Sequence, residues 1–146
     1  MSGKRTATTI AVLLAAVAAT AVNTGTATAE PDLPACQTVP WRSEVAQQFS
    51  AGRWGYLYRL IWCVEQGKIT WAVPEVVPVL PDASDCTWQG PLEDSLKQEP
   101  NSDNWLGFDM GLFVCPAGGG TDGDYPWGII HIRPDGTSSI QDQGTA

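Results

Sequence analysis

Residues 55–73 read GYLYRLIWCVEQGKITWAV and carry the clearest secondary-structure pattern in the chain. Every second residue from 56 to 64 is apolar or aromatic, which is typical of one face of a β-strand. Gln66 and Gly67 then supply the two central residues of a tight turn. The stretch therefore predicts a β-hairpin.

The turn also predicts how the two strands of this hairpin pair. With Glu65 opposite Lys68, three apolar pairs fall on one face: Val64 with Ile69, Trp62 with Trp71, and Leu60 with Val73. A slip of one residue would move every side chain to the other face, so the apolar stripe favours this register. Trp62 and Trp71 are therefore expected in the core.

Residues 105–115 (WLGFDMGLFVC) predict a further strand. One face is continuously apolar, with Leu106, Phe108, Met110, Leu112 and Val114. The opposite face combines large side chains with two glycines, which often mark a bulge or the close approach of another element; it holds Trp105, Gly107, Asp109, Gly111, Phe113 and Cys115. Further on, Pro134-Asp135-Gly136 predicts a hairpin turn with a glycine bulge.

Three segments give weaker patterns. Residues 74–81 (PEVVPVLP) contain three prolines, which predicts an edge strand or a polyproline-like run. Trp41, Val45 and Phe49 recur every fourth residue, which favours a short amphipathic helix. Residues 91–97 are interpreted as a second brief helix or as an exposed loop.

The predicted fold class is all-β, a small antiparallel sandwich or barrel with two disulfides. An α+β sandwich with one or two short helices is the alternative. Residues 30–146 are expected to form one domain, because the whole chain has only 146 residues.

The first 29 residues resemble a secretory signal peptide. Lys4 and Arg5 precede the apolar run IAVLLAAVAA at 10–19, and a small-residue cleavage motif ends at Ala29. Ten apolar residues are too few to span a bilayer, so no membrane anchor is expected after cleavage. We therefore expect a secreted, extracellular protein.

Four cysteines in an exported chain predict two disulfides. Sequential pairing is favoured because it closes two loops of similar size, and each bond would contribute roughly 3–4 kcal/mol. A zinc site or a redox pair is not expected, because the chain contains no CxxC motif. The expected pairs are Cys36–Cys63 and Cys86–Cys115.

Charge and composition exclude several functions. The chain has 16 acidic and 8 basic residues, and loss of Lys4 and Arg5 with the leader would give a net charge of −10. Such acidity argues against a nucleic-acid partner and suits a basic one. A single histidine, His131, and the lack of a hydrolase motif predict no catalysis, no metal and no cofactor.

Seven tryptophans exceed what one small core needs. Exposed indoles suit sugar rings or the centre of a protein interface. We therefore expect a non-catalytic binding protein for a polysaccharide, cell wall or extracellular protein; the candidate ligand-binding residues are Trp54, Trp88, Trp105 and Trp127. A small secreted hydrolase is the weakest alternative.

A proteinase inhibitor is the other alternative. In size, export signal and two sequential disulfides, the chain resembles the small secreted subtilisin inhibitors of actinomycetes. The resemblance implies an inhibitory loop braced by the second disulfide, near Cys86-Thr87-Trp88. The segment continues as TWQGPLEDS and lacks the Tyr-Asp-Pro of that family.

Overall fold

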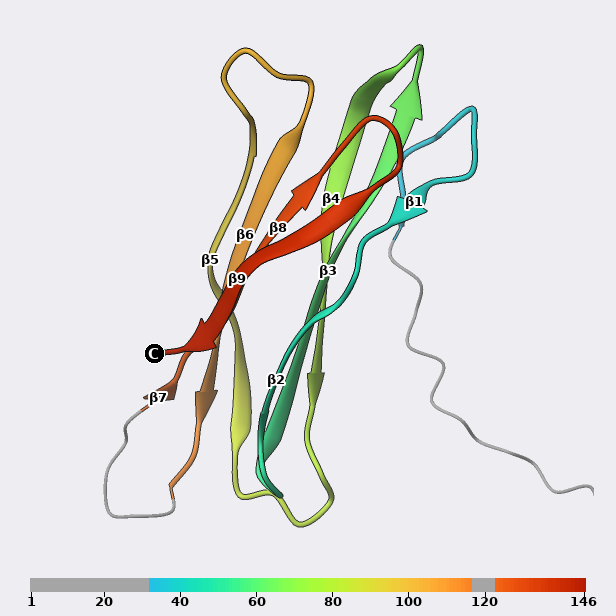
Figure 1. Cartoon of the computed structure of the whole chain (residues 1–146). Helices are drawn as coiled ribbons and strands as arrows, with labels where there is room; N and C mark the ends of the chain where they lie inside the picture. The colour runs from blue at the N-terminus through green and yellow to red at the C-terminus, as the bar shows by residue number, and fades with distance from the viewer. Residues whose placement is uncertain (1–31, 117–122) are drawn as a thin grey trace, which may run out of the picture. The chain divides into compact units, whose positions relative to one another are not determined.

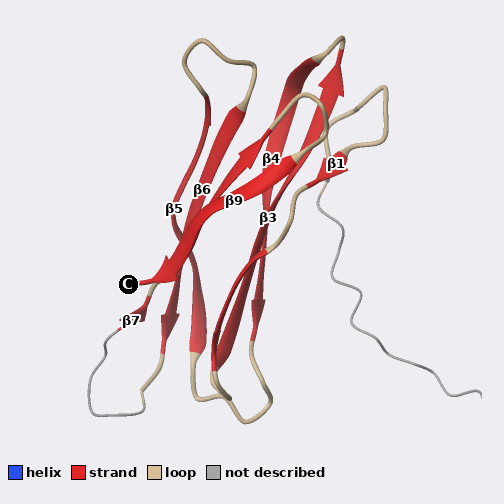
Figure 2. Ribbon diagram, in the orientation of Figure 1, coloured by secondary structure: helices blue, strands red, loops and turns tan. Residues whose placement is uncertain are grey.

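The computed structural model describes residues 32–116 and 123–146, which belong to one compact unit, Pro31–Ala146. The predicted signal peptide and most of the glycine-rich stretch after Cys115 lie outside the described residues. The described chain consists of strands and loops without a helix (Figure 2). The all-β prediction is therefore confirmed, and the α+β alternative is wrong.

Two antiparallel sheets form a sandwich (Figure 1). The first sheet, sheet A, is centred on β3 (Trp54–Glu65). One edge of β3 pairs with β4 (Lys68–Val79), and the other pairs with β1 (Trp41–Arg42) and β2 (Ala46–Ser50) in succession. Strand β4 is thus an edge strand, as its prolines predict.

The second sheet, sheet B, has the order β5-β6-β8-β9. Its strands are β5 (Thr87–Gln98), β6 (Trp105–Val114), β8 (Pro126–Ile132) and β9 (Ser138–Thr145). The short β7 (Gly123–Asp124) pairs with the end of β6. Polar side chains of β9 join the two sheets along one side, because Ser138 and Gln143 accept hydrogen bonds from the backbone of Glu44 and Gln47.

The β3–β4 hairpin turns where the sequence predicts. Both turn residues have positive φ, 52° at Gln66 and 74° at Gly67, as a type I′ turn requires. Glu65 lies opposite Lys68 and Val64 opposite Ile69, as expected. The predicted register is wrong beyond that point.

A bulge after Cys63 shifts the remaining pairs by one residue. Trp62 lies opposite Ala72 and Leu60 opposite Pro74. Trp62 is fully buried, as predicted, whereas Trp71 is half-buried and turns to the outward side of sheet A. There its Nε1 donates a hydrogen bond to the Ala35 carbonyl at 2.9 Å.

Neither predicted helix is present: residues 41–49 contain β1 and β2 with a break at 43–45, and residues 91–97 lie within β5. Residues four apart share a face in a helix and also in a strand, so the spacing of Trp41, Val45 and Phe49 could not separate the two. Pairing with β3 gives the backbone of β2 its hydrogen-bond partners and settles it as a strand. Residues 91–97 likewise pair with β6 along their length, with irregularities on either side of Pro91.

The core lies between the inward faces of the two sheets. The inward residues of β3 are the predicted alternating ones, every second residue from Tyr56 to Trp62. On β6 the inward face is the one that holds the glycines, Asp109 and Phe113, while the continuously apolar face points outward. The disulfides are Cys36–Cys63 and Cys86–Cys115, which confirms the sequential pairing.

Candidate binding surface

Trp54 belongs to an aromatic cluster in the core. It is 4% exposed and stacks on Phe113, with 4.8 Å between ring centroids and planes 9° apart. Its Nε1 donates a hydrogen bond to Asp124 Oδ2 at 2.6 Å. The indole therefore has one face against Phe113 and its polar edge satisfied within the protein.

Trp88 belongs to the same cluster. Its ring lies tilted against Phe113 at 4.8 Å and against Tyr56 at 6.5 Å. It covers Gly111 so closely that a Cβ there would lie 2.2 Å from Trp88 Cη2. Gly111 thus marks the close approach that the sequence predicts, and Trp88 packs between the sheets.

The other two candidate tryptophans lie apart from this cluster. Trp105 is half-buried and packs against the core. Trp127 is also half-buried but points outward on β8, opposite Gly144, and its indole lies over that glycine. The structure therefore does not bring the four candidates together on one face.

Trp41 was not among the candidates, although it is 46% exposed. It begins β1 and lies over Gly136 in the β8–β9 turn. In the sequence, Trp41 stands between Pro40 and Arg42, outside the segments with a clear strand pattern. This context was the sequence feature that could have indicated an exposed side chain.

The outward side of sheet B carries an apolar surface. Directly opposed residues of antiparallel strands share a face, so the pairs of Phe108 with Ile129 and Met110 with Trp127 lie side by side. Each of these residues is half-buried. We call this surface the outer apolar face; it comprises alternate β6 residues from Leu106 to Val114, together with Trp127 and Ile129 of β8.

Polar and charged residues border this face on both neighbouring strands. On β5, Glu93 lies opposite Met110 and Lys97 opposite Leu106. On β9, Asp142 lies opposite Ile129. All three border residues are exposed, so the surface has an apolar centre with a charged rim.

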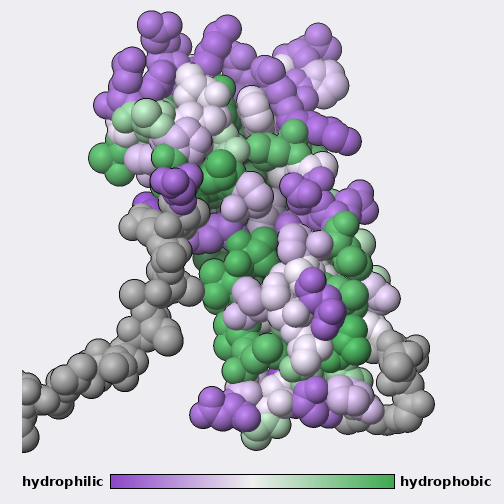
Figure 3. Space-filling model, turned by 180° about the vertical axis from the view of Figure 1, so that it is seen from behind, coloured by the Kyte–Doolittle hydropathy of each residue, from purple (hydrophilic) through white to green (hydrophobic). Residues whose placement is uncertain are grey.

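A second apolar patch lies on the outward side of sheet A. Phe49 is 63% exposed, and its ring lies over Gly55 beside Val79. The space-filling view from behind shows hydrophobic residues exposed over the lower part of the molecule (Figure 3). Hydrophilic residues gather at the end that carries the β3–β4 and β5–β6 hairpins (Figures 1 and 3).

Asp109 is a buried carboxyl group, 1% exposed. The Tyr56 hydroxyl donates a hydrogen bond to Asp109 Oδ1 at 2.5 Å. Burial raises the pKa of Asp109; the hydrogen bond from Tyr56 opposes this rise, and the carboxylate of Asp94 adds to it. The pKa of Tyr56 is raised by burial and by its bond to Asp109, and that of Tyr58 by burial and the charges of Asp109 and Asp94.

Both ring nitrogens of His131 are engaged. The Arg133 guanidinium can only donate, so His131 Nδ1 accepts its hydrogen bond at 3.1 Å. Nε2 then carries the proton and donates to Glu99 Oε2 at 3.0 Å. The imidazole of His131 is thus held between two charged neighbours, Arg133 and Glu99.

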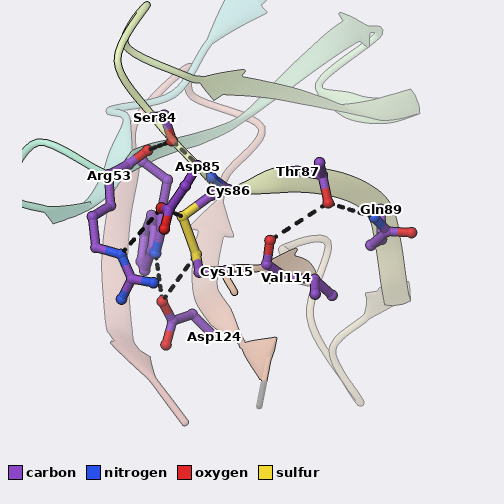
Figure 4. The surroundings of a disulfide bond; sticks show 10 residues. Arg53, Ser84, Asp85, Cys86, Thr87, Gln89, Val114, Cys115 and Asp124 are labelled. Carbon is purple, nitrogen blue, oxygen red and sulfur yellow. Dashed lines mark hydrogen bonds and ion pairs between the residues drawn. A yellow bond between two sulfur atoms is a disulfide. The ribbon is translucent and has the colours of Figure 1, made fainter. Parts of the chain in front are cut away.

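The Cys86–Cys115 disulfide joins the start of β5 to the residue after β6 (Figure 4). Ser84 accepts a hydrogen bond from the Cys86 amide, and Thr87 Oγ1 donates to the Val114 carbonyl. The segment that the inhibitor resemblance singles out is therefore a paired strand, with Trp88 turned between the sheets.

The described residues contain one group of potential metal ligands, Cys36, Cys63 and Glu65. The two sulfurs form a disulfide, so they are not thiolate ligands. Over the same part of the chain, no helix is long and apolar enough to cross a membrane. Comparison with protein-family models, curated proteins and solved structures gave no match.

Proposed function

We propose that the chain is a small, non-catalytic binding protein that acts outside the cell and recognises another protein through the outer apolar face. The observation that carries the proposal is the apolar centre of this face, which sheet B turns away from its own core. Its residues are half-buried and contiguous across two strands, and a contiguous apolar patch with a polar rim is typical of an interaction site.

The composition of the face also supports protein recognition. Aromatic residues and methionine are enriched in protein interfaces, and Phe108, Met110 and Trp127 are adjacent here. The two disulfides are compatible with an extracellular location, and the leader-like residues 1–29 add to this.

The experiment is a peptide selection on the immobilised chain with both disulfides formed. A peptide library displayed on phage is enriched on the native protein, and the enriched clones are compared on three variants. We expect Phe108→Ser and Trp127→Ala to lose binding by at least about tenfold, because central aromatic contacts dominate interface energies. Val77→Gln, which removes a half-buried apolar residue of sheet A, is the matched control and should bind normally.

The proposal fails if every enriched clone binds Phe108→Ser as well as the native chain. Near-ultraviolet circular dichroism of each variant shows whether the fold is intact.

A polysaccharide is the second candidate ligand, and one observation favours it. Because Gly144 has no side chain, the Trp127 indole lies over this glycine on the outward side of sheet B, where an aromatic ring could contact a sugar ring. Depletion of the chain by insoluble chitin, cellulose or peptidoglycan, lost in Trp127→Ala but kept in Trp41→Ala, would favour this candidate.

A further inference from the structure

We propose that the partner of the outer apolar face is a basic protein surface with an apolar centre. This inference rests on the proposed function and names the class of partner. It is carried by the carboxylates that border the face on two separate strands, Glu93 on β5 and Asp142 on β9.

The position of each carboxylate follows from the register. Glu93 is directly opposite Met110, and Asp142 is directly opposite Ile129, so each side chain lies one strand from an apolar neighbour. Neighbouring strands are about 4.8 Å apart, which is well within the screening length of about 8 Å at physiological salt. A cation that approaches the apolar centre therefore meets a carboxylate on either border.

Lys97 is the basic residue on the same border of β5. It lies opposite Leu106, two β6 positions before Phe108, so it flanks one end of the face rather than its middle. In the middle of the face, Phe108 lies opposite Ile129, which in turn lies opposite Asp142 on β9. Met110 lies opposite Glu93 on β5.

The charge of the whole chain also favours a basic partner over a second copy. The chain has 16 acidic and 8 basic residues, so two copies repel each other as they approach. An opposite charge on the partner raises the association rate and orients the encounter. A neutral glycan would gain nothing from the two carboxylates.

The test uses three synthetic peptides of equal length as probes. One alternates Lys with Leu, one alternates Glu with Leu, and one alternates Lys with Ser. Binding to the disulfide-intact chain is measured by fluorescence anisotropy of labelled peptide at low and at physiological salt. We expect the Lys–Leu peptide to bind at least about tenfold more tightly than either of the others, because only it matches both features of the face.

Variants separate the charge from the apolar contact. We expect Glu93→Gln with Asp142→Asn to weaken Lys–Leu binding about three- to tenfold at low salt and to reduce its salt dependence. The control is Asp32→Asn with Asp82→Asn, which removes the same number of charges at two exposed residues elsewhere. This control should bind the Lys–Leu peptide with an affinity within about twofold of the native chain's. Phe108→Ser, with Met110→Ser as a second variant, should abolish Lys–Leu binding.

Three outcomes would overturn the inference. In the first, the Glu–Leu peptide binds as tightly as the Lys–Leu peptide, and Phe108→Ser abolishes its binding. This result would refute the basic partner but leave the proposed function standing. Lys–Leu binding that is unchanged in both Phe108→Ser and Met110→Ser would refute the proposed function as well. A dimer in sedimentation equilibrium that Phe108→Ser converts to monomer would make a second copy the occupant.

Discussion

Asp109 is the residue whose contribution to stability depends most clearly on pH. Its folded-state pKa is raised by burial and by Asp94, although Tyr56 hydrogen-bonds to it. Below its unfolded pKa of about 3.9, both states are protonated and the carboxyl is well accommodated. Above that pH the unfolded chain ionises first, while the folded chain still holds the protonated carboxyl. The free energy of unfolding therefore falls as the pH rises, and Asp109's contribution is lost once the pH has passed its folded-state pKa.

Asp109→Asn should remove that dependence. The amide oxygen still accepts the Tyr56 hydrogen bond, but the side chain no longer ionises. We expect the free energy of unfolding of the variant to fall less between pH 4 and pH 7 than that of the native chain, whatever the constant cost of burying the amide NH2. Urea unfolding followed by tryptophan fluorescence at both pH values measures this, and an equal fall in the two proteins would contradict it.

Gln48 lies on β2 with both amide atoms buried. Neither atom has a hydrogen-bond partner among the described residues, which costs free energy in the folded state. Gln48→Met keeps the side-chain length and removes the polar atoms, so we expect the free energy of unfolding to rise by about 1 kcal/mol. Gln47→Met, at the exposed neighbour, is the control; equal effects of the two changes would refute the explanation.

At the scale of elements, β6 shows how small residues choose the buried face of a strand. A Cβ at Gly107 would lie 2.7 Å from side-chain atoms of Leu60 and Tyr58. At Gly111 the space is filled by Trp88 from β5. Large side chains of β3 in the opposite sheet and of the neighbouring β5 thus occupy the room that the glycines leave. The core therefore closes on the glycine face rather than on the continuously apolar one.

Gly111→Ala tests this packing. The added methyl group overlaps the Trp88 ring, so the indole must move, and we expect a loss of about 1–3 kcal/mol with a changed near-ultraviolet circular dichroism spectrum. In a Trp88→Leu background the same change should cost clearly less, because the overlapping ring is gone. Additive effects in the double-mutant cycle would count against direct packing.

One edge strand of each sheet, β4 in sheet A and β5 in sheet B, carries features that discourage pairing with other chains. Pro74 and Pro78 lie within β4, opposite Leu60 and Tyr56 of β3. Proline has no N–H to donate, and it is tolerated in a sheet where that N–H would point to the free edge. On β5 the register shifts on either side of Pro91 have the same effect by interrupting the edge.

At the scale of the whole molecule, each sheet holds one disulfide. Cys36–Cys63 ties the N-terminal segment to β3, and Cys86–Cys115 ties the start of β5 to the end of β6. The bonded cysteines are 27 and 29 residues apart in sequence. Bonds that close loops of this length constrain the unfolded chain strongly.

Removal of either bond should destabilise the molecule. We expect Cys36→Ala with Cys63→Ala, and separately Cys86→Ala with Cys115→Ala, to lower the free energy of unfolding by about 3.5 kcal/mol. Guanidinium unfolding measures the loss, and the native chain assayed after reduction is the comparison. Non-reduced peptide mapping provides a separate check, and a Cys63–Cys86 peptide would contradict the pairing.

The sequence by itself determined the local features of this protein. Alternation in residues 56–64, the Gln66-Gly67 turn, the Pro134-Asp135-Gly136 turn and the sequential disulfides are all present as predicted. The strand and the turns depend on neighbouring residues, which a sequence pattern records directly. The disulfides join residues 27 and 29 apart, and their pairing was predicted from the even number of cysteines and the similar size of the two loops.

Only the tertiary structure decided which faces are buried and which residues can meet a partner. Alternation shows that Leu106 and Phe108 share a face, but burial of the opposite face depends on Leu60, Tyr58 and Trp88 filling the space over the glycines. For the same reason Trp54 is a core residue, the half-buried Trp88 packs against that core, and Trp127 lies on the outward side. Burial is a property of two surfaces in contact, and a single strand specifies only one of them.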